Sequence, residues 1–190
     1  MTRTGIVALG SLLLAGCAPM TSSGTPGPAA SADLRDAAGQ SVGRANLTTV
    51  GSEVRVVLDL WGLPPGAKGV HIHAVGKCEP PAFTSAGGHF NPGKRQHGTD
   101  NPQGSHAGDL PNVTIGPDGT GRLAIASARV SLTPGGPTAL LGAEGSALVV
   151  HASLDDMKTD PTGNSGARIA CGVIVPAPSA TGGLPVSTRG

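Results

Sequence analysis

EVRVVLDL, residues 53–60, identifies the fold class, because apolar and polar side chains alternate along it. Every second residue from Val54 to Leu60 is valine or leucine, and Arg55 and Asp59 lie between them. A period of two places the apolar side chains on one face of an extended strand, whereas a helix has a period of about 3.6. The segment therefore predicts a half-buried β-strand that belongs to the scaffold.

Short apolar segments of the same kind continue on both sides and are separated by turn sequences. AAG at 37–39, PPG at 64–66 and GPDG at 116–119 contain the residues that tight turns prefer. We expect strands at residues 32–36, 41–48, 53–60, 69–75, 112–115, 121–127, 147–151 and 168–175. This pattern predicts an all-β, antiparallel barrel or sandwich of about eight strands.

Two long stretches, 76–111 and 152–167, interrupt this rhythm and hold most of the polar chemistry. Loops of such length in a compact domain are uncommon unless they are functional or disordered, so we expect two functional loops. A chain of 190 residues fits one domain with tails, and 31 glycines and 17 prolines agree with many turns. The formal charge of +1 provides no basic field for nucleic acid, which is not an expected partner.

The N-terminal residues resemble an export signal. Arg3 precedes an apolar run from Ile6 to Leu14 that is too short to span a bilayer as a stable helix. The run ends in LAGC at 14–17, which resembles the lipobox of bacterial lipoproteins and implies that Cys17 is lipidated. We therefore expect an exported protein in the cell envelope, lipid-anchored to a membrane and facing the periplasm or the exterior. An ordinary signal with an unmodified Cys17 is the alternative.

This interpretation divides the chain into four parts. Residues 1–16 are the signal peptide, and residues 17–31, rich in Thr, Ser, Gly and Pro, form a flexible tether. Residues 32–175 form the folded domain. Residues 176–190 have no strand or helix period, and we expect a disordered tail.

The cysteines agree with export. If Cys17 is lipidated, Cys78 and Cys171 remain as an even pair, which in an oxidising compartment favours a disulfide. Two metal-bound thiolates are the weaker alternative, because neither cysteine has a partner at C-x-x-C spacing.

All six histidines lie between positions 71 and 151. The first two are two residues apart in an expected strand, so both point to the same face. Three more follow in the first long loop with an aspartate, as H-x7-H-x8-H-x2-D, and the last ends an apolar strand. Imidazole suits copper and zinc, and a carboxylate can complete a tetrahedral zinc site. The residues are His71, His73, His89, His97, His106, Asp109 and His151.

Over residues 32–175 the chain resembles the copper/zinc superoxide dismutase family. The matching segments are GVHIH at 69–73, GGHFNP at 87–92, HG at 97–98, HAGDL at 106–110, LVVH at 148–151 and GNSGARIACGVI at 163–174. The resemblance implies a Greek-key β-barrel or flattened sandwich. It also implies an enzyme that converts superoxide to dioxygen and hydrogen peroxide with copper and zinc as cofactors, and so protects the cell envelope.

The resemblance assigns a role to each metal-ligating residue. Copper would be bound by His71, His73, His89 and His151. Zinc would be bound by His89, His97, His106 and Asp109. His89 would bridge the two metals, leave copper when copper is reduced, and carry a proton to the second superoxide.

Two further residues match the family's active site. Arg168 resembles the arginine that holds a small anion beside copper, although taken alone it could be a surface charge. Asp155 matches an aspartate that links a copper histidine to a zinc histidine. The alternative is that Asp155, like its neighbour Asp156, is a solvated residue of a turn.

The sequence leaves several functional questions open. A noncatalytic copper- and zinc-binding envelope lipoprotein on the same scaffold is the competing function. The residues available to steer superoxide toward the site are Lys77, Lys94, Arg95 and Lys158. With two Phe, one Trp and no Tyr there are few aromatic anchors for an interface, and both a homodimer and a monomer agree with the sequence.

Overall fold

The computed structural model describes Met1 and residues 29–178. The expected signal peptide, the lipidated Cys17, most of the tether and the end of the tail lie outside the described residues. The strands are β1 (Ala29–Asp36), β2 (Ser41–Val50), β3 (Glu53–Leu60), β4 (Gly66–Lys68), β5 (Val70–His73), β6 (Val113–Ile115), β7 (Gly121–Ser127), β8 (Ala147–His151), β9 (Arg168–Val173) and β10 (Val175–Pro176).

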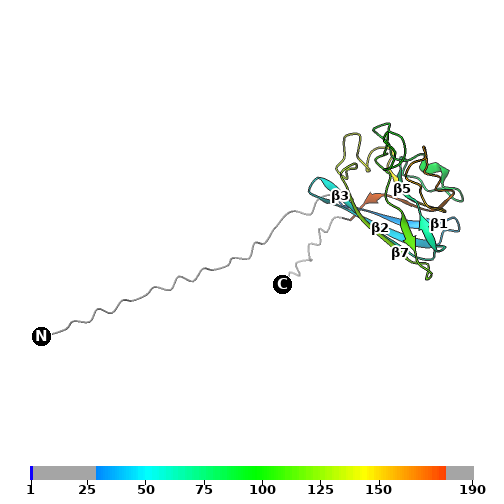
Figure 1. Ribbon diagram of the computed structural model, residues 1–190, viewed down its shortest axis with the longest axis horizontal. Helices are drawn as coiled ribbons and strands as arrows, with labels where there is room; N and C mark the ends of the chain where they lie inside the picture. The colour runs from blue at the N-terminus through cyan, green and yellow to red at the C-terminus, as the bar shows by residue number, and fades with distance from the viewer. Residues whose placement is uncertain (2–28, 179–190) are drawn as a thin grey trace, which may run out of the picture.

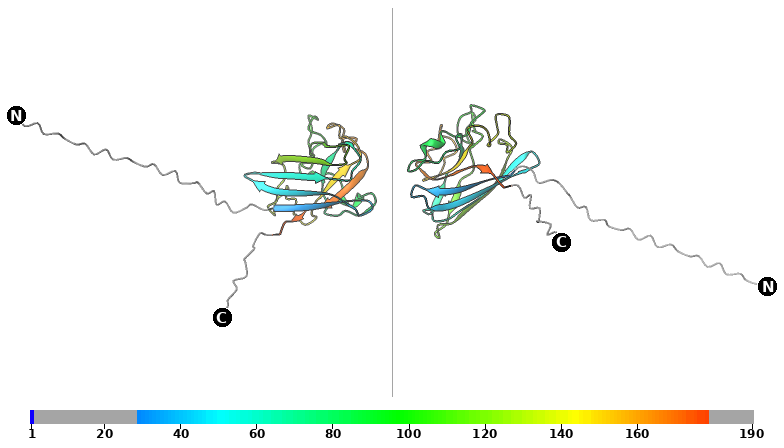
Figure 2. Two further views of the ribbon diagram at one scale, coloured as in Figure 1. Left: turned by 90° about the horizontal axis from the view of Figure 1, so that it is seen from below. Right: turned by 180° about the vertical axis from the view of Figure 1, so that it is seen from behind.

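The strands form a curled antiparallel sheet in the order β5-β8-β9-β1-β2-β3-β7, with β10 paired to β1. The strands β1, β2 and β3 are joined by hairpins and β9 returns to lie beside β1, which is a Greek-key relation. A second sheet contains β4 and β6. Figures 1 and 2 show the strands side by side and the long loops gathered beside β5. The predicted all-β antiparallel architecture is confirmed.

The alternation that predicted β3 is confirmed by its burial. Val54, Val56, Leu58 and Leu60 are all buried, while the residues between them are exposed or half-buried. These side chains join the main core with residues from the other strands. A smaller cluster of Phe83, Ala86, Ala147, Val149 and Cys171 packs near the disulfide. Burial of apolar surface on the inner face of the sheet thus supports the loops that lie above it.

The boundaries of the folded domain differ from the prediction. Residues 29–31, expected in the tether, are the start of β1, where they pair with β2 and where Ala30 is buried. Val175 and Pro176 form β10, which pairs with β1. The folded domain therefore includes Pro176, which was expected to be the first residue of the tail. Small residues such as alanine and serine fit a paired strand as well as a tether, and composition therefore misplaced the boundary.

The expected strand at 69–75 is shorter in the structure, because β5 ends at His73 and the chain then enters the long loop 74–112. That loop contains η1 (Thr84–Ala86), the one helix among the residues described. No helix in this part of the chain is long and apolar enough to cross a membrane. The second long loop, 152–167, joins β8 to β9 as expected.

Candidate metal centre

The strand β5, which carries His71 and His73, has a backbone neighbour on each of its two edges. On one edge β5 pairs with β8, and on the other edge the loop 74–112 folds back against it. The N–H of Ile72 donates to the carbonyl of Gly108 at 2.9 Å, and the N–H of Phe90 donates to the carbonyl of Ile72 at 2.8 Å. The loop therefore continues the sheet at the site.

This arrangement buries both imidazoles. His71 and His73 are on the face away from Ile72, as the period of a strand requires, yet they are only 0% and 1% exposed. Gly108 allows the loop to lie so close, because a Cβ at this position would clash with the carbonyl oxygen of Ile72. The common face of His71 and His73 was predictable from the sequence. Their burial was not, because Gly108 is more than thirty residues further along the chain.

Four histidines from three elements direct nitrogen atoms to one point. His71 and His73 come from β5, His151 from the end of β8 and His89 from the long loop. Their ligand atoms lie within 4.8 Å of one another. Nδ1 of His71 and Nε2 of the other three are buried without a hydrogen-bond partner. Since buried polar atoms are seldom left unpaired, this four-histidine group has the donor set that a metal ion requires.

The opposite ring nitrogens of the same histidines are held by the protein. Nδ1 of His73 lies 2.9 Å from the carbonyl oxygen of Gly87, and Nδ1 of His151 lies 3.1 Å from that of Gly166. Nε2 of His71 lies 2.6 Å from a carboxylate oxygen of Asp155. A hydrogen bond at one nitrogen fixes the ring orientation and leaves the lone pair of the other nitrogen available to a metal.

A second set of donors surrounds Oδ1 of Asp109. This oxygen lies 3.0 Å from Nδ1 of His89, 3.1 Å from Nδ1 of His97 and 3.2 Å from Nδ1 of His106. Nδ1 of His89 and Nδ1 of His106 are themselves 3.2 Å apart. Four atoms bound tetrahedrally to zinc at about 2.0–2.1 Å would lie about 3.3 Å from one another. This histidine–aspartate group therefore fits the dimensions of a zinc site.

His71 also lies near this second group. Ligand atoms of His71, His89, His97 and Asp109 are within 4.8 Å of one another. However, His71 has one nitrogen bound to Asp155 and one that is open, so it can serve one metal only. His106, with its Nδ1 at 3.2 Å from both His89 and Asp109, is the better fourth member.

Asp109 is held by two backbone N–H groups and by one arginine side chain. Its Oδ2 accepts hydrogen bonds from the N–H groups of Gly98 and His106, both at 2.9 Å. Its main-chain carbonyl accepts one from Nη2 of Arg129 at 2.7 Å. Although burial alone would raise the pKa of Asp109, hydrogen bonds from His89, His97 and Gly98 lower it far below the usual value. These contacts therefore favour the carboxylate form of Asp109.

Asp155 connects the two groups. Its Oδ2 faces Nε2 of His71 at 2.6 Å, and its Oδ1 faces Nε2 of His97 at 3.0 Å. Asp155 is 1% exposed, whereas Asp156 is exposed and bonds to Thr159 and Asn164 within its own loop. Of the two adjacent aspartates, the structure thus brings Asp155 into the centre.

The electrostatics leave the four-histidine group uncharged. Burial disfavours the imidazolium form and lowers the pKa of His71 to about 3, of His73 to about 2 and of His151 to about 4. The pKa of His89 is lowered for the same reason. His97 differs, because the carboxylates of Asp109 and Asp155 outweigh its burial and raise its pKa to about 9. The two carboxylates thus favour a positive charge at His97, which must release a proton to bind a metal, whereas the four-histidine group already offers neutral lone pairs.

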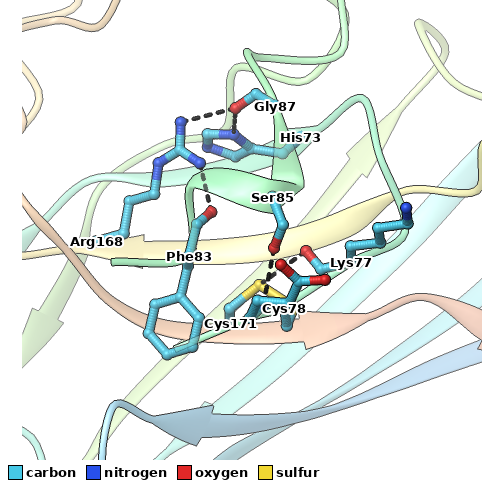
Figure 3. The surroundings of a disulfide bond; sticks show 9 residues. His73, Lys77, Cys78, Phe83, Ser85, Gly87, Arg168 and Cys171 are labelled. Carbon is cyan, nitrogen blue, oxygen red and sulfur yellow. Dashed lines mark hydrogen bonds between the residues drawn. A yellow bond between two sulfur atoms is a disulfide. The ribbon is translucent and has the colours of Figure 1, made fainter. Parts of the chain in front are cut away.

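Arg168 lies at the start of β9 and shares a carbonyl with the four-histidine group. Its Nη1 donates to the carbonyl of Phe83 at 2.6 Å and its Nη2 to that of Gly87 at 2.7 Å. The carbonyl of Gly87 is also the one that His73 contacts, as Figure 3 shows. Arg168 lines a cavity of about 330 Å³ with His73, His89 and His151. A small anion in this cavity would meet both the guanidinium and the open histidine nitrogens.

The disulfide predicted between Cys78 and Cys171 is confirmed. It joins the long loop to β9 beside the Phe83 and Gly87 carbonyls that hold Arg168 (Figure 3). Since Cys171 is three residues after Arg168, the crosslink fixes the donor and the acceptor segments against each other.

The four candidate steering residues are exposed, and none of them lines the cavity among the residues described. Arg95 uses its Nε to bond the carbonyl of Gly104. Lys77, Lys94, Arg95 and Lys158 therefore remain a prediction only. Arg168 is the one lysine or arginine found at the cavity wall in the described part of the chain.

Two residues that touch the centre were missed in the sequence. Arg129 bonds the main chain of Asp109, and Asn112 bonds the main chain of Asp155. In each pair the two residues lie in different segments of the chain, so no local sequence spacing relates them. Arg129 follows β7, whereas Asp109 is in the first long loop, and Asp155 is in the second long loop. The proximity of Asn112 to Asp109 in the sequence was the one available signal.

The chain is similar to known proteins over most of its length. Residues 41–174 match the family model of copper/zinc superoxide dismutase. Superoxide dismutase [Cu-Zn] 1 of Aquifex aeolicus is 46% identical over 144 residues, which are 75% of this chain and 85% of that protein. Superoxide dismutase [Cu-Zn] 2 of the same organism is 44% identical over 175 residues, 92% of this chain and 99% of that protein.

A solved structure agrees with the fold. The crystal structure of a SOD-like protein from Bacillus subtilis superposes with a TM-score of 0.72 at 39% identity, covering 76% of this chain and 97% of that chain. Residues 41–174, which match the family model, contain the strands from β2 to β9, both long loops and every residue of the two histidine groups. This chain belongs to the copper/zinc superoxide dismutase family.

Proposed function

We propose that this protein converts superoxide to dioxygen and hydrogen peroxide, with copper and zinc as its cofactors. One observation carries the proposal: four buried histidine nitrogens without partners converge on one point, and three of these histidines line a cavity whose wall also carries Arg168. The relatives with the same activity in their names and the family match support it. The fit of both donor groups to metals supports the two cofactors.

The proposed assignment gives each donor atom one metal. Copper is held by the four-histidine group, through His71, His73, His89 and His151. Zinc is held by the histidine–aspartate group, through His89, His97, His106 and Asp109. His89 belongs to both groups, so that its Nε2 would be available to copper and its Nδ1 to zinc.

Copper held by these histidines would supply one-electron redox chemistry, by which one superoxide would be oxidised to dioxygen and a second reduced to peroxide. Arg168 binds the anion in the cavity and keeps it beside the histidine nitrogens. Nε2 of His89 holds a proton between the two half-reactions and gives it to the peroxide. A second proton from water balances two superoxides and two protons against one dioxygen and one hydrogen peroxide. Asp109, His97 and His106 keep Nδ1 of His89 in place meanwhile.

A noncatalytic metal-binding protein would need the donor groups but not Arg168. A storage site gains nothing from a guanidinium directed at an anion cavity, so the arginine favours turnover. The deciding experiment is superoxide consumption by the purified protein with copper and zinc verified at both sites. Activity no greater than that of free copper would refute the enzyme and leave the storage function.

Arg168→Glu is expected to lower kcat/KM for superoxide roughly tenfold or more while copper stays bound, because it repels the anion without removing a ligand. Arg168→Lys keeps the charge but cannot bond two carbonyls with a planar fork, so an intermediate loss is expected. Stopped-flow decay of superoxide measures both. Arg55→Glu on the exposed face of β3 is the matched control, since it makes the same charge change away from the cavity. Equal rates for Arg168→Glu and Arg55→Glu would contradict the role.

We further propose that the protein works at the cell envelope, anchored through a lipid on Cys17. The support is the sequence: a short apolar run ends at a lipobox-like LAGC, and a Gly-, Ser- and Pro-rich stretch precedes the domain. In this location the enzyme removes superoxide that reaches the envelope from outside. The disulfide agrees with an oxidising compartment.

Cys17→Ser is expected to move the protein from the membrane fraction to the soluble fraction, because it removes the acylated sulfur. Labelling of cells with a radioactive fatty acid, followed by detergent phase partition, measures both the lipid and the distribution. Ala18→Ser, a change of similar size at the next residue, should keep the label. A wild-type protein that takes up no label would refute the anchor.

A further inference from the structure

Asn112 lies just before β6 and forms two hydrogen bonds with the main chain of Asp155 in the other long loop. Its Oδ1 accepts a hydrogen bond from the main-chain N–H of Asp155 at 2.9 Å, and its Nδ2 donates to the main-chain carbonyl of Asp155 at 2.9 Å. A side-chain amide can accept and donate in one fork, whereas a carboxylate only accepts and a hydroxyl has one donor. Both main-chain polar groups of Asp155 are thus fixed by a single side chain.

Because its main chain is fixed, Asp155 has few positions available for its carboxylate. An aspartate side chain has two torsions, so the place of the carboxylate follows from the backbone. The carboxylate of Asp155 must reach Nε2 of His71 at 2.6 Å and Nε2 of His97 at 3.0 Å at the same time. A small shift of the Asp155 backbone would lengthen at least one of these two contacts.

The other supports of Asp155 come from its own loop. The N–H of Ser153 bonds the carbonyl of Ser165, and the N–H of Asp156 bonds that of Gly163. Gly163 closes on the carboxylate so tightly that a Cβ there would clash with Oδ1 of Asp155. These contacts shape the loop 152–167, and a bond from the N–H of His97 to Asp160 at 2.6 Å ties that loop to the histidine–aspartate group. Asn112 adds a tie to the main chain of Asp155 itself, from a position three residues after Asp109.

We propose that Asn112 is a positioning residue for the metal centre, which acts through Asp155 to hold the rings of His71 and His97. This inference rests on the ligand assignment proposed above. Asn112 touches neither histidine, and its effect passes through the backbone of Asp155. Loss of the fork lets Asp155 withdraw from the two rings, and both metals bind more weakly.

The test measures metal affinity directly. Asn112→Asp keeps the shape and the acceptor but loses the donor, and Asn112→Ser loses the fork without adding charge. Zinc and copper affinities of the metal-free protein are obtained by competition with a chelator, and electron paramagnetic resonance reports the copper environment. We expect both variants to bind zinc roughly 10- to 100-fold more weakly and to show an altered copper spectrum. If one variant does not fold, the other decides.

Asn91→Asp is the matched control. Asn91 forms the same kind of fork on a backbone, with Nδ2 to the carbonyl of Arg95 at 2.8 Å and Oδ1 from its N–H at 3.0 Å. Asn91→Asp makes the same chemical change in the same loop, and the Asn91 side chain bonds Arg95 rather than Asp155. A zinc affinity that falls equally in Asn112→Asp and Asn91→Asp would overturn the inference.

A double-mutant cycle separates positioning from general stability. If Asn112 acts through Asp155, Asn112→Asp should weaken zinc binding no further when Asp155→Asn is already present. Losses that add would mean an independent structural role and would overturn the inference. His97→Ala in the same series tests the ligand assignment itself. If the wild type binds no zinc, or if His97→Ala binds it normally, the assignment and the inference both fail. If only the Asn112 variants behave like the control, the inference alone fails.

Discussion

His89→Ala is expected to abolish dismutation and to weaken copper and zinc binding together. Its Nε2 is one of the four converging nitrogens without a partner, and its Nδ1 lies 3.0 Å from Oδ1 of Asp109 and 3.2 Å from Nδ1 of His106. Removing a ligand should cost more than the roughly 10- to 100-fold that loss of an outer hydrogen-bond partner costs. Metal analysis after chelator challenge, together with superoxide decay, measures the two effects.

His97→Ala is the informative companion to this variant. His97 belongs to the histidine–aspartate group only, so zinc should be lost first while copper is largely kept. The ratio of copper to zinc retained should therefore differ clearly between the two variants. Unchanged content of both metals in His89→Ala would refute the shared ligand.

Removal of the disulfide by Cys78→Ser with Cys171→Ser is expected to lower the free energy of unfolding of the metal-free protein by about 4–5 kcal/mol. The two cysteines are 93 residues apart, and a crosslink over a loop of this length removes much entropy from the unfolded chain. Both cysteines are replaced so that neither is left as an unpaired thiol. Denaturant titration of the metal-free forms measures the difference.

Chemical reduction of the wild-type protein provides the control for this experiment. The reduced wild type and the double serine variant should unfold at similar denaturant concentrations, because both lack the same crosslink. A loss below about 1 kcal/mol in both would show that the loop 74–112 is constrained mainly by its other contacts. In that case the bonds from Ile72 to Gly108 and Phe90 would be the main restraints.

The residues of the centre could be found in the sequence because their signals are local. The spacing of His71 and His73 in a strand gives their common face without any knowledge of the fold. The alternation from Val54 to Leu60 similarly gave β3 with its observed bounds. Local periodicity survives folding because the backbone geometry of a strand is the same everywhere.

Long-range contacts could not be found in this way. The burial of β5 depends on a loop that returns to its free edge, and no periodicity reports that return. The bonds from Arg129 to Asp109 and from Asn112 to Asp155 join residues 20 and 43 positions apart. The start of β1 was missed for a related reason, since residues 29–31 are recognisable as a strand only through their partners in β2 and β10.

The carboxylate of Asp155 and the ring of His89 couple the affinities of the two metal sites. Each reaches both donor groups, so binding at one site orders atoms that the other site uses. Such linkage is reciprocal: whatever factor zinc contributes to the affinity for copper, copper contributes to the affinity for zinc. The copper affinity of a zinc-free protein, compared with that of the zinc-loaded protein, therefore gives the coupling free energy between the two sites.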